Sequence, residues 1–265
     1  MDINFLKQNG VDTDKALELF GDMDIYNETF QDYLDGIDEK LSNLKRSKDN
    51  ENWQDYGIFA HSIKSDARYL GFTKEAEIFL QHEMAGKQEN QRFIEKEYDN
   101  LLKTVSYMTS IVKRYLSGEK ALSRMPEPEV RPVVNTVTAP LEDVVLIVDD
   151  SKIVDNFALK VMDGMYKGVV ALDGKEAIDI ISSNKYNILA ILLDLNMPNV
   201  GGFEVLDYLK NSNHYSKIPI SIITGEDSKD MIDKAFKYNI VDMLVKPFSK
   251  SDFLRVLDKT INLNK

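Results

Sequence analysis

The stretch Ile191–Pro198, Ile-Leu-Leu-Asp-Leu-Asn-Met-Pro, decides the fold of the C-terminal half of this 265-residue chain. An unbroken apolar run from Leu189 to Leu193 leads into Asp194, which is typical of a strand buried on both faces of a parallel sheet. The Asn and Pro that follow, and a Gly-Gly pair after them, break the chain into a loop. A carboxylate is therefore expected at the carboxyl end of a central strand, where open α/β sheets place their sites. The alternative role for one such Asp is to cap the next helix.

The remainder of the C-terminal half alternates apolar β-branched runs with amphipathic segments. This alternation predicts a doubly wound, five-stranded parallel sheet with helices on both faces. The expected strands are 144–148, 168–172, 188–194, 218–224 and 240–245, and the expected helices are 152–162, 174–182, 202–210, 230–238 and 251–262.

Polar side chains follow four of these strands. Asp149 and Asp150 end the first strand, Asp194 the third, Thr224 the fourth and Lys246 precedes a proline after the fifth. Because the carboxyl ends of parallel strands share one edge, these residues are expected to meet. Three carboxylates at one place repel each other and need a cation, and oxygen ligands suit Mg²⁺ or Mn²⁺. A hydroxyl and an ammonium beside them can stabilise a transferring phosphoryl group.

The N-terminal half has a helical period and no proline, because all seven prolines lie after Met125. Expected helices cover 13–20, 24–46, 53–70, 74–85 and 90–116, with mostly short connections, which favours an antiparallel helix bundle. Four of the prolines fall within 126–140 and indicate an extended linker. The expected domains are a bundle at 1–118, a linker at 119–140 and an α/β domain at 141–265.

The helix expected at 53–70 carries one candidate reactive side chain. Its apolar stripe faces a core, and at ~100° per residue His61 points roughly 140° away from the centre of that stripe. His61 is therefore expected to be exposed, between the small residues Gly57 and Ser65, with Lys64 and Arg68 on the neighbouring flank. An imidazole is nucleophilic near neutral pH, and a nearby ammonium can offset the charge of a phosphoryl group on it. The alternative is a plain surface histidine.

These motifs resemble two known families. His61-Ser-Ile-Lys64-Ser65, with Gly71 ten residues after the histidine, resembles the histidine-phosphotransfer (HPt) domain motif, although that family usually has Gly directly after the lysine. The C-terminal half resembles a response-regulator receiver domain of the flavodoxin-like fold. The two together imply a two-component phosphorelay protein.

The receiver resemblance implies a role for each strand-end residue. Asp194 would be the phosphoacceptor, and Asp149 and Asp150 the acidic pair that holds Mg²⁺ or Mn²⁺ with the backbone carbonyl of Asn196. Thr224 and Lys246 would contact the phosphoryl oxygens, and the Lys246–Pro247 peptide would be cis. Asn196 and Glu226 occupy positions that tune hydrolysis in the family, so a short-lived acyl phosphate is expected. Met243 departs from the family, which usually has Tyr or Phe there as a switch.

Composition excludes several other classes. A net charge of −11 disfavours binding to nucleic acid through a basic face, and the absence of cysteine excludes disulfides and thiolate metal sites. His82 and His214 lie among polar residues and are expected to be ordinary surface residues, without a zinc site. No stretch approaches the ~20 apolar residues of a membrane span, and the N-terminus lacks the features of a signal peptide. We expect a cytoplasmic protein with no membrane or nucleic-acid partner.

The expected function is a phosphorelay in which His61 and Asp194 exchange phosphoryl groups with receiver aspartates and with histidines. Expected partners are a sensor histidine kinase and other receiver or HPt proteins, and the linker span of ~25–30 Å also allows the bundle to dock on its own receiver. The sequence lacks the Asn- and Gly-rich boxes of an ATP-binding kinase domain, so we expect a phosphotransfer protein and no kinase. The alternative is a binding adapter in which only the receiver is phosphorylated and the bundle docks a partner or blocks the receiver.

Overall fold

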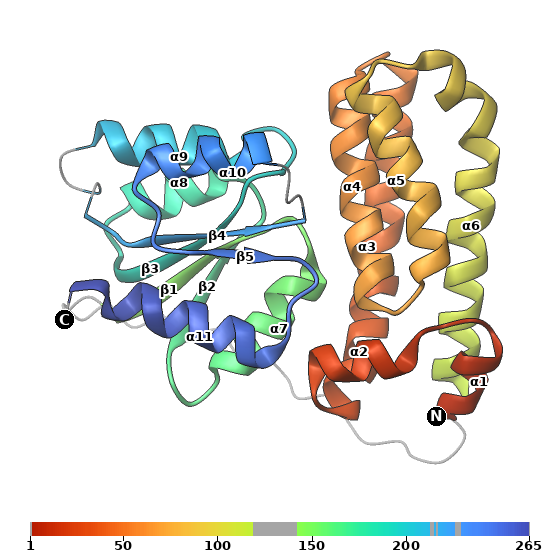
Figure 1. The fold of residues 1–265 in the computed structure, drawn as a ribbon, viewed down its shortest axis with the longest axis horizontal. Helices are drawn as coiled ribbons and strands as arrows, with labels where there is room; N and C mark the ends of the chain where they lie inside the picture. Colours follow the sequence, from red (N-terminus) through yellow and green to blue (C-terminus); the bar gives the residue numbers. More distant parts are fainter. Residues whose placement is uncertain (1, 119–141, 213–214, 216, 226–228, 265) are drawn as a thin grey trace.

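The structure, a computed structural model, describes residues 2–118, 142–212, 215, 217–225 and 229–264, which form a helical half and a half built on a sheet (Figure 1). The linker expected at 119–140, and the positions of His214 and Glu226, lie outside the described residues. None of the helices in the described ranges is long and apolar enough to cross a membrane.

The N-terminal half is helical, as predicted. Helices α3, α4, α5 and α6 stand side by side, and the shorter α1 and α2 close one end of the bundle (Figure 1). The helices are α1 Ile3–Gln8, α2 Thr13–Phe20, α3 Met23–Asp49, α4 Trp53–Tyr69, α5 Thr73–Lys87 and α6 Gln91–Ser117. The sequence analysis missed α1, which is short and begins where the Asp2 side chain accepts a hydrogen bond from the Asn4 amide.

Local capping explains where α4 begins and ends. The Asn52 side chain accepts a hydrogen bond from the Asp55 amide and satisfies one of the free N–H groups of the first turn. Gly71 follows α4 with a φ of +85°, a left-handed conformation that favours glycine. The predicted apolar stripe of this helix is buried, and Tyr56, Ala60 and Ile63 are each 0% exposed.

Helices α4 and α5 cross at a pair of glycines. A Cβ atom added to Gly86 would lie 2.6 Å from the Cα of Gly57 and 2.7 Å from the carbonyl oxygen of Trp53. The two backbones can approach this closely only because neither residue has a side chain. Gly57 therefore serves helix packing, whereas the sequence analysis placed it in an open patch beside His61.

The C-terminal half contains the predicted five-stranded, all-parallel sheet, in the order β2-β1-β3-β4-β5. Its strands are β1 Glu142–Val148, β2 Lys167–Ala171, β3 Tyr186–Asp194, β4 Ile220–Thr224 and β5 Met243–Val245. The helices between and after them are α7 Lys152–Met162, α8 Gly174–Ser182, α9 Gly202–Asn211, α10 Lys229–Ala235, the 3₁₀ turn η1 Phe236–Tyr238 and α11 Lys250–Ile261. Strand β5 is shorter than the predicted 240–245, although Val241 and Asp242 before it already form backbone hydrogen bonds with β4.

Alternate residues of the central strands point to opposite faces of the sheet. On one face, Ile147, Leu192 and Ile223 pack with α7 and α11, in the same apolar cluster as the bundle core. On the other face, Leu193 and Ile222 pack with α8 and α9. Both faces are thus covered, as a purely parallel sheet requires.

The bundle packs against the C-terminal half along α7 (Figure 1). Phe20 of α2 meets Phe157 of α7 edge-on, with ring centroids 5.6 Å apart, and Tyr69 of α4 meets Phe248 in the same way at 5.9 Å. The docking that the sequence analysis allowed is therefore present, and it rests on buried aromatic side chains.

Helices α3 and α7 run antiparallel at this contact. Glu28 pairs with Lys160, and Asp32 forms a side-chain hydrogen bond with Asn156. One turn further along α3, a Cβ added to Gly36 would lie 3.8 Å from the Cδ of Lys152. Every fourth residue of α3 thus contacts every fourth residue of α7, in the opposite chain direction.

The glycine crossing of α4 and α5 can be tested by adding a methyl group. Gly86→Ala should lower the free energy of unfolding of the chain by about 1–3 kcal/mol, because the new Cβ meets backbone atoms that cannot rotate away. Chemical denaturation measures this change. Gly118→Ala is the control, because its Cβ would lie 3.4 Å from the Tyr115 carbonyl, an ordinary contact. Equal stability of the two variants would contradict the crossing.

Candidate functional site

Three carboxylates meet at the carboxyl edge of the sheet, as predicted. Asp149 and Asp150 follow β1, Asp194 ends β3, and one oxygen from each lies within 4.8 Å of the others. Val148 pairs with Leu193 in the sheet, so the two strand ends are level and bring their acidic residues together. This is the only group of at least three such potential ligands among the described residues.

Lys246 lies among these carboxylates. Its Nζ is 2.5 Å from Oδ2 of Asp194 and 2.6 Å from Oδ2 of Asp149, and the residue is 4% exposed. Burial disfavours its charge, but the two carboxylates outweigh burial and raise the pKa of Lys246 well above the usual value. The Lys246–Pro247 peptide is cis, as the receiver resemblance implies.

Thr224 ends β4 at the same edge and is fully buried. Asp194 pairs with Ile223 in the sheet, so Thr224 extends one residue beyond the level of Asp194. The sequence prediction that Asp149, Asp150, Asp194, Thr224 and Lys246 share one rim therefore agrees with the geometry.

The edge carries more negative charge than its lysines neutralise. Burial, together with Asp194 and Asp150, raises the pKa of Asp149 to about 7 even though Lys246 opposes the shift. Burial and Asp194 also raise the pKa of Asp150, and burial with Asp149 raises that of Asp155 on α7. A divalent cation would relieve this repulsion, and carboxylate oxygens are its preferred ligands. The three clustered carboxylates thus fit Mg²⁺ or Mn²⁺.

The loop after β3 is fixed to Asp194. The Asn196 backbone N–H donates a hydrogen bond of 3.0 Å to Oδ1 of Asp194, which turns the chain at the strand end. The role of the Asn196 carbonyl as a metal ligand stays a prediction. Met243 begins β5 opposite Ile222 and is half-buried, so this position supplies neither a ring nor a hydroxyl.

His61 is on α4 but is not exposed, so this part of the prediction is wrong. The residue is 3% exposed, and Lys64 and Ser65 beside it are also buried. The prediction treated the bundle as a free body, whereas the C-terminal half covers this side of α4. His61 nevertheless points away from the bundle's apolar stripe, as its helical position indicated.

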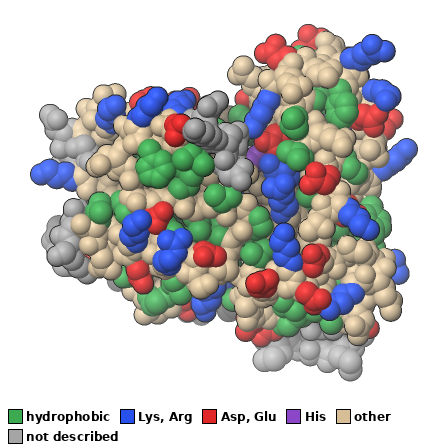
Figure 2. All heavy atoms as spheres, in the orientation of Figure 1, with side chains coloured by type: hydrophobic (Ala, Val, Ile, Leu, Met, Phe, Trp, Pro, Cys, Tyr) green, Lys and Arg blue, Asp and Glu red, His purple; other side chains and the backbone are tan. Residues whose placement is uncertain are grey.

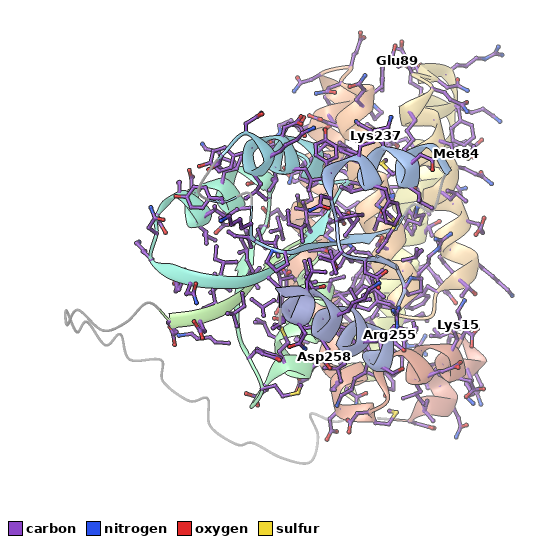
Figure 3. All side chains as sticks on the ribbon, turned by 60° about the vertical axis from the view of Figure 1, so that its left-hand side comes forward. Lys15, Met84, Glu89, Lys237, Arg255 and Asp258 are labelled. Atoms are coloured by element: carbon purple, nitrogen blue, oxygen red, sulfur yellow. The ribbon has the colours of Figure 1, made fainter. Side chains whose placement is uncertain are left out.

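Glu83 of α5, which the sequence analysis missed, holds one side of the His61 ring. Its Oε1 is 2.9 Å from Nδ1 of His61, and its Oε2 is 2.5 Å from Nζ of Lys64. Burial opposes the charge of Glu83, but hydrogen bonding to His61 and the charges of His61 and Lys64 lower its pKa below the usual range. Glu83 is 3% exposed and faces α4, whereas the next residue of α5, Met84, which is labelled in Figure 3, is exposed.

The ionised Glu83 can only accept a hydrogen bond, so Nδ1 of His61 donates to it and Nε2 is the ring nitrogen that faces away from Glu83. Nε2 has no hydrogen-bond partner among the described residues. A Cβ added to Gly225 would lie 2.6 Å from Nε2 and 3.4 Å from Oγ of Ser65. Because Gly225 directly follows Thr224, His61 faces the rim of the sheet that carries Asp194.

A second polar group missed by the sequence analysis joins the two halves. Asp66 of α4 accepts a hydrogen bond of 3.0 Å from Oγ of Ser151 and forms an ion pair of 2.7 Å with Lys40 of α3. Burial disfavours the charge of Lys40, but Asp66 and Asp150 outweigh it and raise the pKa of Lys40. Lys40 therefore brings a cation from the bundle toward the acidic edge.

His82 is not a surface residue, which corrects another expectation. It is 1% exposed, and its Nδ1 lies 2.7 Å from the Tyr56 hydroxyl inside the bundle. Burial lowers the pKa of His82 to about 4, so the ring is neutral near pH 7. The polar neighbours of His82 in the sequence concealed its position on the buried face of α5.

The close approach of His61 to Gly225 can be tested directly. Gly225→Ala should lower the equilibrium constant between the docked and undocked forms of the chain by about 5- to 100-fold. The reason is that the new methyl group meets the His61 ring. Small-angle scattering and hydrogen exchange at α4 amides measure docking. Gly36→Ala is the matched control at the same interface, where a Cβ would have 3.8 Å of room to Lys152. Undiminished docking of Gly225→Ala would contradict the contact.

Comparisons with known proteins match the C-terminal half. The family described as response regulator receiver domain matches residues 145–258. The two-component response regulator ORR3 of Oryza sativa is 32% identical over 128 residues, which cover 48% of this chain and 95% of that protein. The CAI-1 autoinducer sensor kinase/phosphatase CqsS of Vibrio cholerae is 32% identical over 146 residues, but these span 54% of this chain and only 20% of that relative.

Solved structures are similar to part of this chain. The chemotaxis protein CheY4 of Vibrio cholerae is 28% identical, with a TM-score of 0.41, and covers 45% of this chain and 98% of its own. The Mn(2+)-bound response regulator Rcp1 is 26% identical, with a TM-score of 0.40, and covers 43% of this chain and 89% of its own. Through its C-terminal half, this chain belongs to the response regulator receiver family.

Proposed function

We propose that this chain is a phosphorelay protein in which His61 of the bundle and Asp194 of the receiver exchange a phosphoryl group. The bundle then acts as a histidine-phosphotransfer domain. The observation that carries the proposal is the position of His61: its free Nε2 faces Gly225, at the rim where Asp194 lies. A histidine buried for packing alone would not direct an unpaired nucleophilic nitrogen at the acidic edge of a receiver.

The transfer is a displacement at phosphorus. With the phosphoryl group on Nε2 of His61, a carboxylate oxygen of Asp194 attacks the phosphorus atom. The new O–P bond forms as the N–P bond breaks, and the electron pair returns to Nε2. Glu83 keeps the proton on Nδ1 throughout and stabilises the positive charge that phosphorylation places on the ring. The reverse reaction uses the same groups.

Two lysines offset the charge of the phosphoryl group on its two carriers. Nζ of Lys64 lies 3.2 Å from Nδ1 of His61, so its ammonium is beside the phosphohistidine. Lys246 already contacts Asp194 and would bind a phosphoryl oxygen there, with the Thr224 hydroxyl as a second donor.

We propose that Mg²⁺ or Mn²⁺ binds to Asp149, Asp150 and Asp194, with the Asn196 carbonyl as a further ligand. The support is the close cluster of carboxylates and the repulsion that raises the pKa of Asp149 and Asp150. When bound, such a cation neutralises carboxylate charge and orients phosphoryl oxygens for in-line attack.

The proposed partners are a sensor histidine kinase and other receiver or HPt proteins, which exchange phosphoryl groups with His61 or Asp194. The similarity of the receiver to part of a sensor kinase and to two-component response regulators supports this class of partner. We propose that the chain transfers phosphoryl groups in the cytoplasm without an ATP-dependent kinase activity of its own.

A binding adapter is the second candidate function. The observation in its favour is that the bundle covers the phosphorylation edge of the receiver, as an inhibitory module would. In an adapter, His61 would be a packing residue, and phosphorylation of Asp194 by an outside donor would release the bundle. Signalling by an adapter would survive His61→Gln, whereas a relay would not.

Phosphate tracing tests the relay. With a labelled small-molecule phosphodonor and Mg²⁺, the wild-type chain should carry label on both His61 and Asp194. Asp194→Asn should retain label on His61 only when a phosphohistidine donor or kinase supplies it, and EDTA should remove the Asp194 label. A chain phosphorylated at His61 should label its own Asp194 at a rate independent of dilution. Absence of label from both residues in the wild type would defeat the proposal.

The role of Glu83 is tested by Glu83→Gln, which keeps the size of the side chain and removes its charge. Transfer between His61 and Asp194 should slow by about 10- to 100-fold, because the amide can also donate and no longer holds Nδ1 protonated. Quench-flow labelling measures the rate. Glu95→Gln on α6, at an exposed hydrogen bond of 2.9 Å with Gln91, is the control. An unchanged rate in Glu83→Gln would show that Glu83 does not orient the ring.

A further inference from the structure

Tyr69 is a bundle residue that reaches the receiver's phosphorylation edge. It is the last residue of α4, two turns beyond His61, and it is 1% exposed. Its ring meets Phe248, two residues after Lys246, edge-on at 5.9 Å with an interplanar angle of 84°. Tyr69 therefore lies against the loop that carries Lys246.

The Tyr69 hydroxyl is a buried polar group without a hydrogen-bond partner among the described residues. The Phe248 amide is near its oxygen but does not form a hydrogen bond of good geometry. Leaving a hydroxyl donor unsatisfied in a buried position is costly, so such groups call for a physical explanation. Other buried tyrosines of the bundle are satisfied: Tyr26 donates to the Leu70 carbonyl at 2.9 Å, and Tyr115 to Asn27 at 2.7 Å.

The surroundings of the hydroxyl identify the missing acceptor. Tyr69 interacts electrostatically with Lys246, Asp149 and Asp194, the groups that would surround a phosphoryl group. Both Asp149 and Asp194 already bind Lys246. A phosphoryl group on Asp194 would bring three further acceptor oxygens to this place.

We propose that Tyr69 senses phosphorylation of the receiver: in the docked chain, its hydroxyl donates a hydrogen bond to the phosphoryl group on Asp194. The inference rests on the proposed function, because it requires that Asp194 is phosphorylated while the bundle is docked. The receiver's own β5 has Met243, without a hydroxyl, at the half-buried position opposite Ile222, so in the proposal the aromatic donor comes from the bundle.

The hydrogen bond has two consequences. Phosphorylation of Asp194 strengthens docking, because the unpaired donor gains an acceptor. It also slows hydrolysis, in which a water oxygen bonds to phosphorus while the O–P bond to Asp194 breaks, leaving the carboxylate and inorganic phosphate. The docked bundle excludes water from the phosphoryl group, and Tyr69 holds the bundle in place.

The test compares Tyr69→Phe with wild type and with Tyr115→Phe, all as full chains. Tyr115→Phe removes a hydroxyl that donates to Asn27 within the bundle, and it is the matched control. After labelling of Asp194 with acetyl phosphate and Mg²⁺, the aspartyl phosphate of Tyr69→Phe should decay about five- to tenfold faster than that of wild type. Tyr115→Phe should decay at the wild-type rate.

Hydrogen exchange at α4 amides provides the second measurement, with beryllofluoride as the mimic of the phosphoryl group. Beryllofluoride should increase protection in wild type and in Tyr115→Phe but not in Tyr69→Phe, with equal protection in all three before it is added. Equal decay rates, or loss of docking in Tyr69→Phe without beryllofluoride, would overturn the inference and leave Tyr69 a packing residue. Failure of Asp194 to accept label in wild type would instead overturn the proposed function.

Discussion

The buried ammonium of Lys246, bound by Asp149 and Asp194, is the constraint on which the receiver edge depends. A charge that is 4% exposed persists only with close partners, so the ends of β1, β3 and β5 must meet at one level. The five-stranded parallel order places them there. Acidic groups still outnumber cations at this edge, so its carboxylates repel one another. A divalent ion or the bundle's Lys40 can reduce this repulsion.

The contact between bundle and receiver combines strong and weak parts. The exposed pair of Glu28 and Lys160 adds little, because solvent screens it. The buried contacts count for more: the aromatic rings of Phe20 and Phe157, and the hydrogen bond from Ser151 to Asp66. Glycine at positions 57, 86 and 225 lets the backbones approach, so that Glu83 reaches His61 and His61 reaches the receiver. The absence of side chains at these glycines thus allows the short distances at which the polar side chains interact.

Local pattern was enough to predict the receiver half, because each functional residue follows an apolar run and a parallel sheet brings such ends together. The bundle helices α2 to α6 were equally visible in their 3.6-residue period, but the short α1 was not. Burial of His61 was not predictable in this way, because the receiver, a separate part of the sequence, covers this residue. Glu83 left one usable signal: it lies on the apolar side of α5 with Ala76 and Phe79, where an acidic residue needs a partner. Its partner, 22 positions earlier, has no local signature.

If His61 and Asp194 exchange phosphoryl groups as we propose, the docked state that favours transfer within one chain also closes Asp194 to histidines of other proteins. Transfer within the chain and transfer with other proteins can both occur only if docking is weak enough for the two halves to separate. Because the two halves belong to one chain, the effective concentration of the bundle at its own receiver is of the order of millimolar, so an intrinsic docking constant near millimolar leaves both forms populated. An outside partner at micromolar concentration then competes only with higher affinity or when the bundle is displaced. Under the proposed function, covalent linkage makes the chain's own receiver the default partner of His61, and any change that loosens docking would shift phosphoryl flow toward other proteins.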